Sequence, residues 1–131
     1  MEECWNLVWY RDKEGAEPLV KAFLKDKNLR DDEKAKLVER IKLLEKEGNR
    51  LAVDLPNVLH TLKGKQYRKI YELRVTGTPS NPRIFVFFSD QREIVLLFGV
   101  RKGGKRTKEM EKHYSRAVRL RDKWLLRREQ Q

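Results

Sequence analysis

Hydrophobic and polar positions divide the first half of the chain into one strand-like and two helix-like segments. Residues 6–10 (NLVWY) are short, aromatic and β-branched, which predicts a strand. Apolar residues then recur at helical spacing over about residues 18–28 and 31–48, where Asp31 or Asp32 is a suitable cap for the second helix. We expect the two helices to form a hairpin with one apolar face.

The second half predicts a sheet followed by a helix. Residues 50–66 are expected to be a connecting stretch. Strand-like runs follow at residues 67–75, 83–88 and 93–100. The connections between them are short enough for antiparallel hairpins. Thr107 is expected to cap a last helix. The predicted architecture is one α+β domain over residues 1–131, with an N-terminal strand and a helical hairpin packed on a small, mainly antiparallel sheet, plus a C-terminal helix.

Alternation along the first of these three runs predicts which side chains share a face of the sheet. One face receives Arg68, Ile70, Glu72 and Arg74, and the other receives Lys69, Tyr71, Leu73 and Val75. The second set is mostly apolar and is expected to face the helices, whereas the first set is expected to face solvent. The pattern leaves open whether the N-terminal strand joins the sheet at an edge or beside a central strand.

Composition limits the class of protein. The chain has 131 residues, and its longest apolar run, residues 94–100, is far shorter than the roughly 20 residues of a membrane span. The N-terminus lacks the basic start and apolar stretch of a signal peptide. Cys4 is the single cysteine, which excludes an intrachain disulfide. These features predict a cytoplasmic, single-domain protein that crosses no membrane.

Charge is distributed unevenly along the chain. Residues 1–62 contain 12 Lys/Arg and 13 Asp/Glu, whereas residues 63–131 contain 19 and 7, so the second half carries the whole excess of the net +11. A basic surface confined to one half indicates a polyanion or an acidic protein as partner.

Familiar catalytic motifs for nucleotide binding or nucleophilic catalysis are absent from the sequence. His60 and His113 are the only histidines, and neither has a metal-ligand spacing. No metal and no cofactor are therefore expected. The sequence instead places many cations beside the strands, and Gly103 and Gly104 would let a ligand approach the backbone closely. The alternative is that Glu72 pairs with a neighbouring arginine and that the face is merely soluble.

The order of several short motifs resembles a known family. YELRV (71–75), RIFVFF (83–88) and IVLLFGVRKGGKRT (94–107) are similar to the strands of the RelE/ParE superfamily of toxins, and most similar to its phage-derived HigB-like branch. WYRDKEGAEPLVKAFL (9–24) and LKGK (62–65) resemble the same branch. The resemblance covers nearly the whole chain. The order and spacing of the motifs are more specific than any single motif.

This resemblance implies a RelE-like fold and the toxin of a type II toxin–antitoxin system. Such a toxin is a ribosome-dependent endoribonuclease that cleaves mRNA and inhibits translation. The ribose 2′-OH attacks the adjacent phosphate without a metal ion, while cations stabilise the developing charge. The implied partner is a cognate antitoxin, expected to be acidic and to carry a helix-turn-helix part. The toxin–antitoxin complex would bind its own operator DNA through the antitoxin.

The resemblance also carries roles over to individual positions. The candidate catalytic residues are Arg83, Arg74, Lys102, Lys105, Arg106 and Tyr114. The candidate RNA-binding residues are Lys65, Arg68, Lys69, Arg101 and His113. A lysine or tyrosine would serve as general base only if neighbouring cations depressed its pKa. Two positions depart from the family pattern: Phe98 stands where many members have histidine, and Glu72 stands where some have a catalytic lysine.

Two other functions are compatible with the same sequence. One is a ParE-like inhibitor of DNA gyrase, which uses the same fold without cutting RNA. The other is a non-catalytic RNA-binding module. The basic residues near strand ends favour the nuclease.

Overall fold

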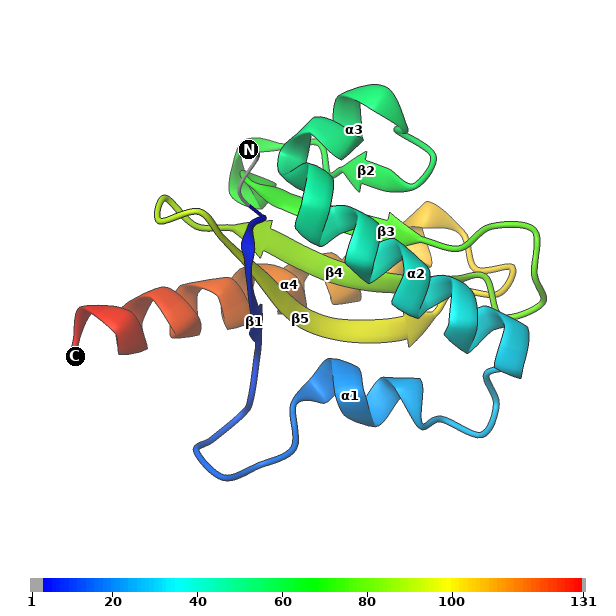
Figure 1. The fold of residues 1–131 in the computed structure, drawn as a ribbon, viewed down its shortest axis with the longest axis horizontal. Helices are drawn as coiled ribbons and strands as arrows, with labels where there is room; N and C mark the ends of the chain where they lie inside the picture. Colours follow the sequence, from blue (N-terminus) through cyan, green and yellow to red (C-terminus); the bar gives the residue numbers. More distant parts are fainter. Residues whose placement is uncertain (1–3, 131) are drawn as a thin grey trace.

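The computed structural model describes residues 4–130 and shows an α+β domain (Figure 1). The elements, in chain order, are β1 (Asn6–Trp9), α1 (Leu19–Leu24), α2 (Asp31–Glu47), the 3₁₀ turn η1 (Gly48–Arg50), α3 (Leu51–Asp54), β2 (Leu59–Thr61), the 3₁₀ turn η2 (Lys65–Tyr67), β3 (Ile70–Arg74), β4 (Pro82–Phe88), β5 (Glu93–Arg101) and α4 (Thr107–Glu129).

The five strands form one mixed sheet in the order β1-β5-β4-β3-β2. β3, β4 and β5 pair antiparallel in sequence order, as expected for consecutive hairpins, and β2, which was not predicted, pairs antiparallel with β3. β1 lies at one edge and pairs parallel with β5, with Leu7 opposite Ile94. The N-terminal strand is therefore an edge strand, which decides the question that the sequence left open.

Helices cover both faces of the sheet. α1 and α2 lie in front of it and α4 crosses behind it in Figure 1. On the α1/α2 side, the core includes Leu37, Leu73 and Leu96, which are all inaccessible to solvent. On the α4 side, here called the α4 face, it includes Phe85 and Phe98.

The prediction that one face of β3 points to solvent is wrong. Ile70 and Glu72 are both buried, and they lie on the α4 face beside the aromatic residues of β4. The physical reason is the length of α4, which is long enough to shield this face. A sequence signal was present, because every residue of β4 except Arg83 is apolar, and a continuous apolar run is the pattern of a strand covered on both sides.

Several predicted boundaries also need correction. The stretch at residues 50–66 contains the edge strand β2, which has only three residues and one buried apolar side chain. The strand expected at residues 67–75 starts at Ile70, because η2 ends at Tyr67 and residues 68 and 69 form a turn. The helix expected over residues 18–28 is shorter, Leu19–Leu24. These segments are short, and their local patterns are correspondingly weak.

The helix caps also differ from the prediction. Arg30, not Asp31 or Asp32, is the N-cap of α2, and Arg106, not Thr107, is the N-cap of α4. α2 ends as expected at Gly48, whose φ of 62° and ψ of −147° favour glycine. Gly48 also lies directly beneath the indole of Trp5, which leaves no room for a side chain.

Glu33 links the start of α2 to the loop between β3 and β4. Its side chain is fully buried, and its carboxylate accepts the backbone N–H groups of Arg30 (2.9 Å) and Ser80 (3.0 Å). Burial acts to raise the pKa of Glu33, but hydrogen bonds from Thr78, Arg30 and Ser80 together hold that pKa below its ordinary value.

Because the Glu33 pKa is lowered by folding, its contribution to stability is present above the unfolded pKa of about 4.5 and is lost as the pH falls through the lower folded value. Glu33→Gln should therefore unfold more easily at pH 7 and should lose less stability between pH 5 and pH 3. Urea unfolding across this range checks the prediction. Glu39→Gln, on the exposed side of the same helix, is the control. Parallel pH profiles for Glu33→Gln and the wild type would contradict it.

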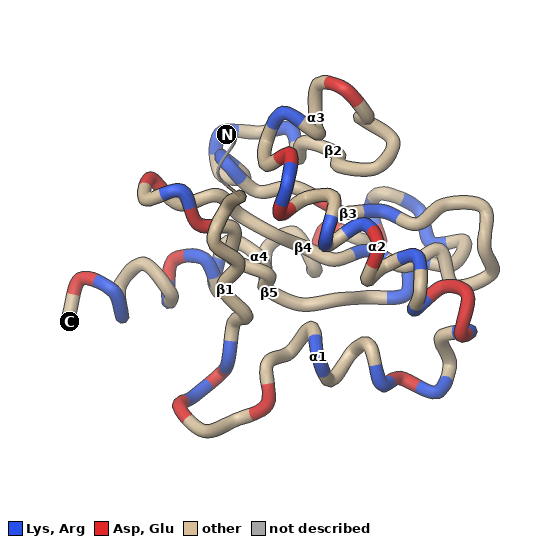
Figure 2. The backbone as a smooth tube through the Cα atoms, in the orientation of Figure 1, with Lys and Arg blue, Asp and Glu red and all other residues tan. Residues whose placement is uncertain are grey.

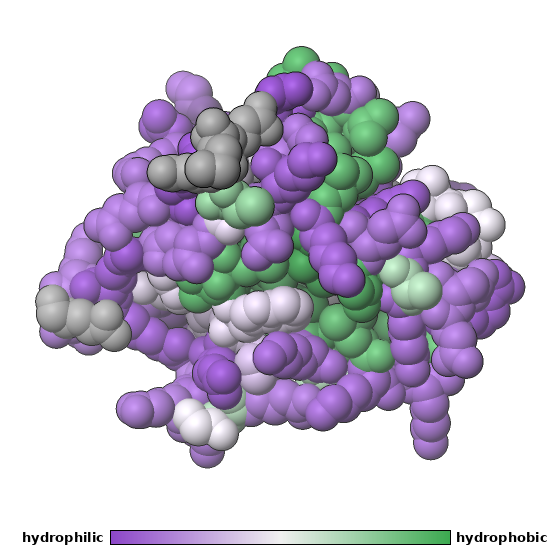
Figure 3. All heavy atoms as spheres, viewed as in Figure 1, coloured by the Kyte–Doolittle hydropathy of each residue, from purple (hydrophilic) through white to green (hydrophobic). Residues whose placement is uncertain are grey.

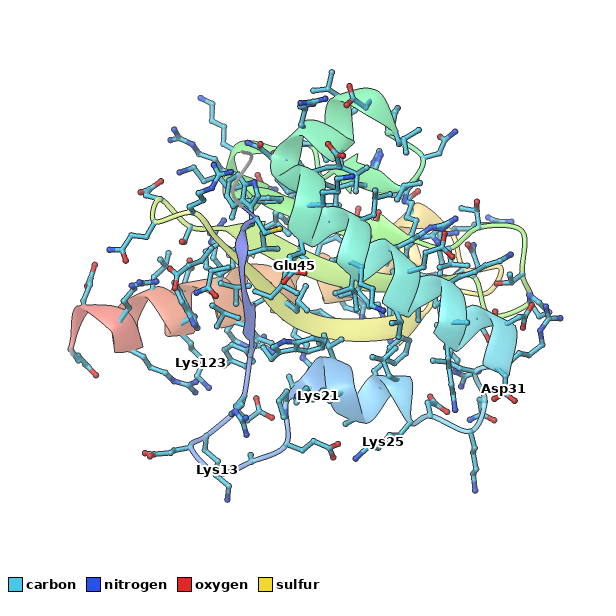
Figure 4. The ribbon with its side chains drawn as sticks, in the orientation of Figure 1. Lys13, Lys21, Lys25, Asp31, Glu45 and Lys123 are labelled. Carbon is cyan, nitrogen blue, oxygen red and sulfur yellow. The ribbon has the colours of Figure 1, made fainter. Side chains whose placement is uncertain are left out.

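The surface over α1 and α2 is mainly hydrophilic, and apolar residues reach it around α3 (Figure 3). Figure 4 labels Lys13, Lys21 and Lys25, which lie in the loop before α1, in α1 and at its C-terminal end. Lys21 lies over the ring of Trp9, and Lys25 pairs with Glu17 at 2.6 Å. Across residues 4–130, no helix is long and apolar enough to cross a membrane.

Candidate active site

The candidate site lies at the end of the sheet where β3 and β5 finish and β4 begins. Register brings Arg74 opposite Arg83, and Pro82 opposite Arg101, so three strand ends meet here. Figure 2 shows Lys and Arg positions at this end of the sheet, at the right of the view, near the acidic start of α2. Residues 102–106, here called the glycine loop, continue from β5 at the same place.

A buried carboxylate balances one of the two arginines. Glu72 is 1% exposed, and its Oε1 accepts hydrogen bonds from Arg74 Nη2 (2.8 Å) and Nε (3.3 Å). A buried ion pair is costly to desolvate unless its geometry is good, and a two-donor contact is the geometry that arginine favours. Of the two neighbouring arginines that could pair with Glu72 from the sequence, Arg68 and Arg74, the structure shows Arg74.

Within residues 4–130, Arg83 forms no salt bridge with a carboxylate, and its guanidinium is held by oxygen atoms of its own turn. Its Nη1 donates to Asn81 Oδ1 at 2.7 Å, and more weakly to the carbonyls of Asn81 and Pro82 at 3.3 Å. Its Nε is buried and has no hydrogen-bond partner within the described residues. Burial lowers the pKa of Arg83, and the neighbouring Arg74 lowers it further. An arginine nevertheless stays charged at neutral pH, so this is a buried cation with spare donor capacity.

Asn81 connects Arg83 to the glycine loop. Besides its contact with Arg83, its side chain donates from Nδ2 to the carbonyl of Gly103 at 3.2 Å. Backbone hydrogen bonds join the same segments, from Lys102 N to Asn81 O (3.3 Å) and from Gly103 N to Ser80 O (2.8 Å). Asn81 has a φ of 47°, a conformation that asparagine tolerates better than most residues. The loop is therefore attached to the strand that carries Arg83.

Lys105 and Arg106 of the glycine loop are exposed, whereas Lys102 is half-buried like Arg74. Lys102 Nζ donates to the carbonyl of Lys105 (2.6 Å), and Lys105 Nζ donates to that of Arg101 (3.2 Å). These contacts curl the loop over its own backbone. Gly103 has a φ of 55°, which permits the turn, and there is open space where its side chain would be. Arg106 is exposed at the N-cap of α4.

Tyr114 faces both the core and the charged groups. Its ring packs edge-on against Phe85 (5.9 Å between centroids) and Tyr67 (5.8 Å). Burial raises the pKa of Tyr114, Glu72 adds to the rise, and the two arginines oppose it. The depressed pKa that a tyrosine base would require is therefore not found, and Tyr114 keeps its proton at neutral pH.

His60 joins these groups, although no motif or spacing in the sequence selects it. It lies on β2 directly opposite Glu72, and the charges of Glu72, Arg74 and Arg83 all act on it. We call His60, Glu72, Arg74, Arg83 and Tyr114 the arginine cluster. The sequence carries no local signal for this position, because only the pairing of the short strand β2 with β3 brings His60 to this place.

Three predicted RNA-binding residues lie elsewhere. Lys65 lies in η2, and Arg68 and Lys69 lie in the turn before β3, so the length of β3, roughly 13 Å, separates them from Arg74. They line a cavity of about 490 Å³ together with Arg121 of α4. Lys69 pairs there with Asp90. The sequence placed these cations and the strand-end arginines in one site, whereas the structure separates them into two groups.

The two remaining candidates border the glycine loop. Arg101 ends β5 and lies 3.6 Å from Asp26. His113 precedes Tyr114 on α4, and its pKa is lowered by burial and by three nearby cations, namely Lys112, Lys105 and Arg116. Phe98, where the family often has histidine, is buried and stacks on Phe85. Within residues 4–130, no three acidic, histidine or cysteine side chains are grouped as a metal site.

Comparison with known protein families matches residues 25–119 to the family described as phage-derived protein Gp49-like (DUF891). A search of curated proteins finds no match. The matched range begins just after α1, ends within α4 and contains every residue of the arginine cluster and of the glycine loop. The chain therefore belongs to the phage-derived Gp49-like family, whose members are often toxin-like.

Proposed function

We propose that the protein is the toxin of a type II toxin–antitoxin system and that it cleaves mRNA on the ribosome. The observation that carries the proposal is the pairing of Arg74 with Arg83, two cations opposite each other on adjacent strands, of which only Arg74 is in contact with the buried carboxylate of Glu72. Placing like charges together inside a protein costs free energy, and such strained electrostatics are typical of functional sites. An anionic ligand would relieve this repulsion.

The chemistry of RNA cleavage fits the charges of this site. Attack of the ribose 2′-OH on the adjacent phosphate concentrates negative charge on the phosphoryl oxygens. Preorganised donors aimed at that position stabilise the transition state more than the substrate. Arg83 has a buried, unsatisfied Nε and a guanidinium fixed by Asn81, which suits this role. Lys102, Lys105 and Arg106 would contribute further positive charge from the rim.

Family membership and charge support the proposed partners. The Gp49-like family suggests a toxin–antitoxin context, in which the toxin is neutralised by a cognate antitoxin. Because residues 63–131 carry a net charge of +12, we expect that antitoxin to be acidic and to cover part of the basic end of the sheet. A helix-turn-helix part of the antitoxin would bind the operator DNA.

Induced expression in bacterial cells, followed by mapping of RNA 5′ ends, tests the function. We expect growth to stop after expression is induced. We also expect new mRNA 5′ ends that keep a fixed phase relative to codons. Growth arrest with intact mRNA and damaged DNA would replace this proposal with a gyrase inhibitor. Normal growth at full expression of folded protein, with no new ends, would leave a binding module as the better description.

A further inference from the structure

His60 is placed to act on a ligand of the arginine cluster. It is the central residue of β2, and its neighbour Leu59 is buried in the core on the α1/α2 side. Side chains alternate along a strand, so His60 projects to the α4 face. Its direct partner across the strands is Glu72, which is in turn opposite Phe85 of β4. Unlike Glu72, His60 is partly exposed, so a ligand can reach it.

The charged groups around His60 keep its imidazole neutral. Partial burial lowers the pKa of His60 below its ordinary value of 6.5, and Arg74, Lys63 and Arg83 lower it further. Glu72 opposes this effect, but its carboxylate is already bound to the guanidinium of Arg74. A neutral imidazole has one nitrogen with a free lone pair, and that nitrogen can accept a proton at pH 7.

The other members of the arginine cluster are less suited to accept a proton. Arginines stay protonated in proteins. Tyr114 has a raised pKa and keeps its hydroxyl proton. Glu72 is almost fully buried and holds Arg74 through two contacts, so protonating it would break a buried ion pair. His60 is the remaining titratable group of the cluster.

We propose that His60 is the general base of the reaction and takes the proton from the attacking ribose 2′-OH. This step rests on the proposed RNA cleavage. The O2′–P bond forms as the P–O5′ bond breaks, which leaves a 2′,3′-cyclic phosphate on one product. The 2′-hydroxyl proton passes to the imidazole, and the leaving 5′-oxygen takes a proton from water. Arg74 and Arg83 stay protonated throughout and stabilise the charge on the phosphoryl oxygens.

A single-turnover cleavage assay, with mRNA both free and bound to ribosomes, tests this role. His60→Ala should slow cleavage by about 10²–10⁴-fold, the usual contribution of a general base, and should leave RNA affinity nearly unchanged. The wild-type rate should rise with pH through a value below 6.5 and then level off, and the variant should lack this rise. Added imidazole should restore part of the lost rate.

Controls separate this proposal from the proposed function. Thr61→Ala alters the adjacent exposed residue of the same strand and should cleave like the wild type. His60→Gln provides a second variant in case His60→Ala does not fold, which circular dichroism would show. If the wild type cleaves no RNA, the proposed function fails. If the wild type cleaves and both folded variants match its rate and pH profile, His60 is not the base.

Discussion

Arg83→Ala is expected to relieve the growth arrest caused by the protein and to lower RNA cleavage by roughly 10²–10³-fold. Loss of one preorganised donor to a developing oxyanion has this effect in other enzymes. Arg83 is the cluster arginine that forms no salt bridge within the described residues, so no contacting carboxylate neutralises its positive charge. The measurement is single-turnover cleavage by purified protein, together with survival after induced expression.

Two further variants show whether the effect of Arg83→Ala comes from its position, its charge or its shape. Arg119→Ala removes an exposed arginine from α4 and should leave toxicity unchanged, which controls for loss of net charge. Arg83→Lys keeps the charge but loses the planar two-donor fork, so intermediate activity is expected. The phosphate site is wrongly placed if Arg83→Ala folds, as judged by its thermal melt, and remains as toxic as the wild type.

Gly48→Ala should produce the largest loss of stability, about 2–5 kcal/mol. An alanine would have to adopt the φ of 62° and ψ of −147° at the end of α2, a strained conformation for any residue with a side chain. Its Cβ would also clash with the indole of Trp5, which would have to move. The backbone strain and the steric clash add, and together they should lower the melting temperature by on the order of 10 °C.

Gly104→Ala is the matched control for this stability prediction. Gly104 has no neighbouring atom within 4 Å of an added Cβ, and its φ is not in the left-handed region. Differential scanning calorimetry of both variants compares the same substitution at two sites. Equal melting temperatures for Gly48→Ala and the wild type would show that Trp5 does not pack against α2 in solution.

Local patterns predicted most of the architecture. β4 and β5 have strong apolar and β-branched runs, and α4 has a long stripe at helical spacing, so each was visible in the sequence. β2 was not predicted, because a three-residue edge strand has too few positions for a period to show. Its strand character comes from pairing with β3, an interaction between residues about 12 positions apart.

The candidate site was only partly predictable for the same reason. Consecutive hairpins place Arg74 and Arg83 on neighbouring strands at one end of the sheet, so their proximity follows from the order of the strands. The burial of Glu72 depends on α4 covering the sheet, which alternation within a single strand does not reveal. His60 enters the cluster through β2, so its position became visible only in three dimensions.

The attachment of the glycine loop to Ser80 and Asn81 bears on how rapidly the site can respond to a substrate. Two backbone hydrogen bonds extend the ladder between β4 and β5 into the loop, and the side chain of Asn81 adds a third bond. The loop backbone is therefore ordered before RNA arrives, and only the flexible ends of its lysines must adjust. Little reorganisation energy and little loop entropy are then spent during binding, so a dense group of cations can act on a phosphate without a separate closing motion.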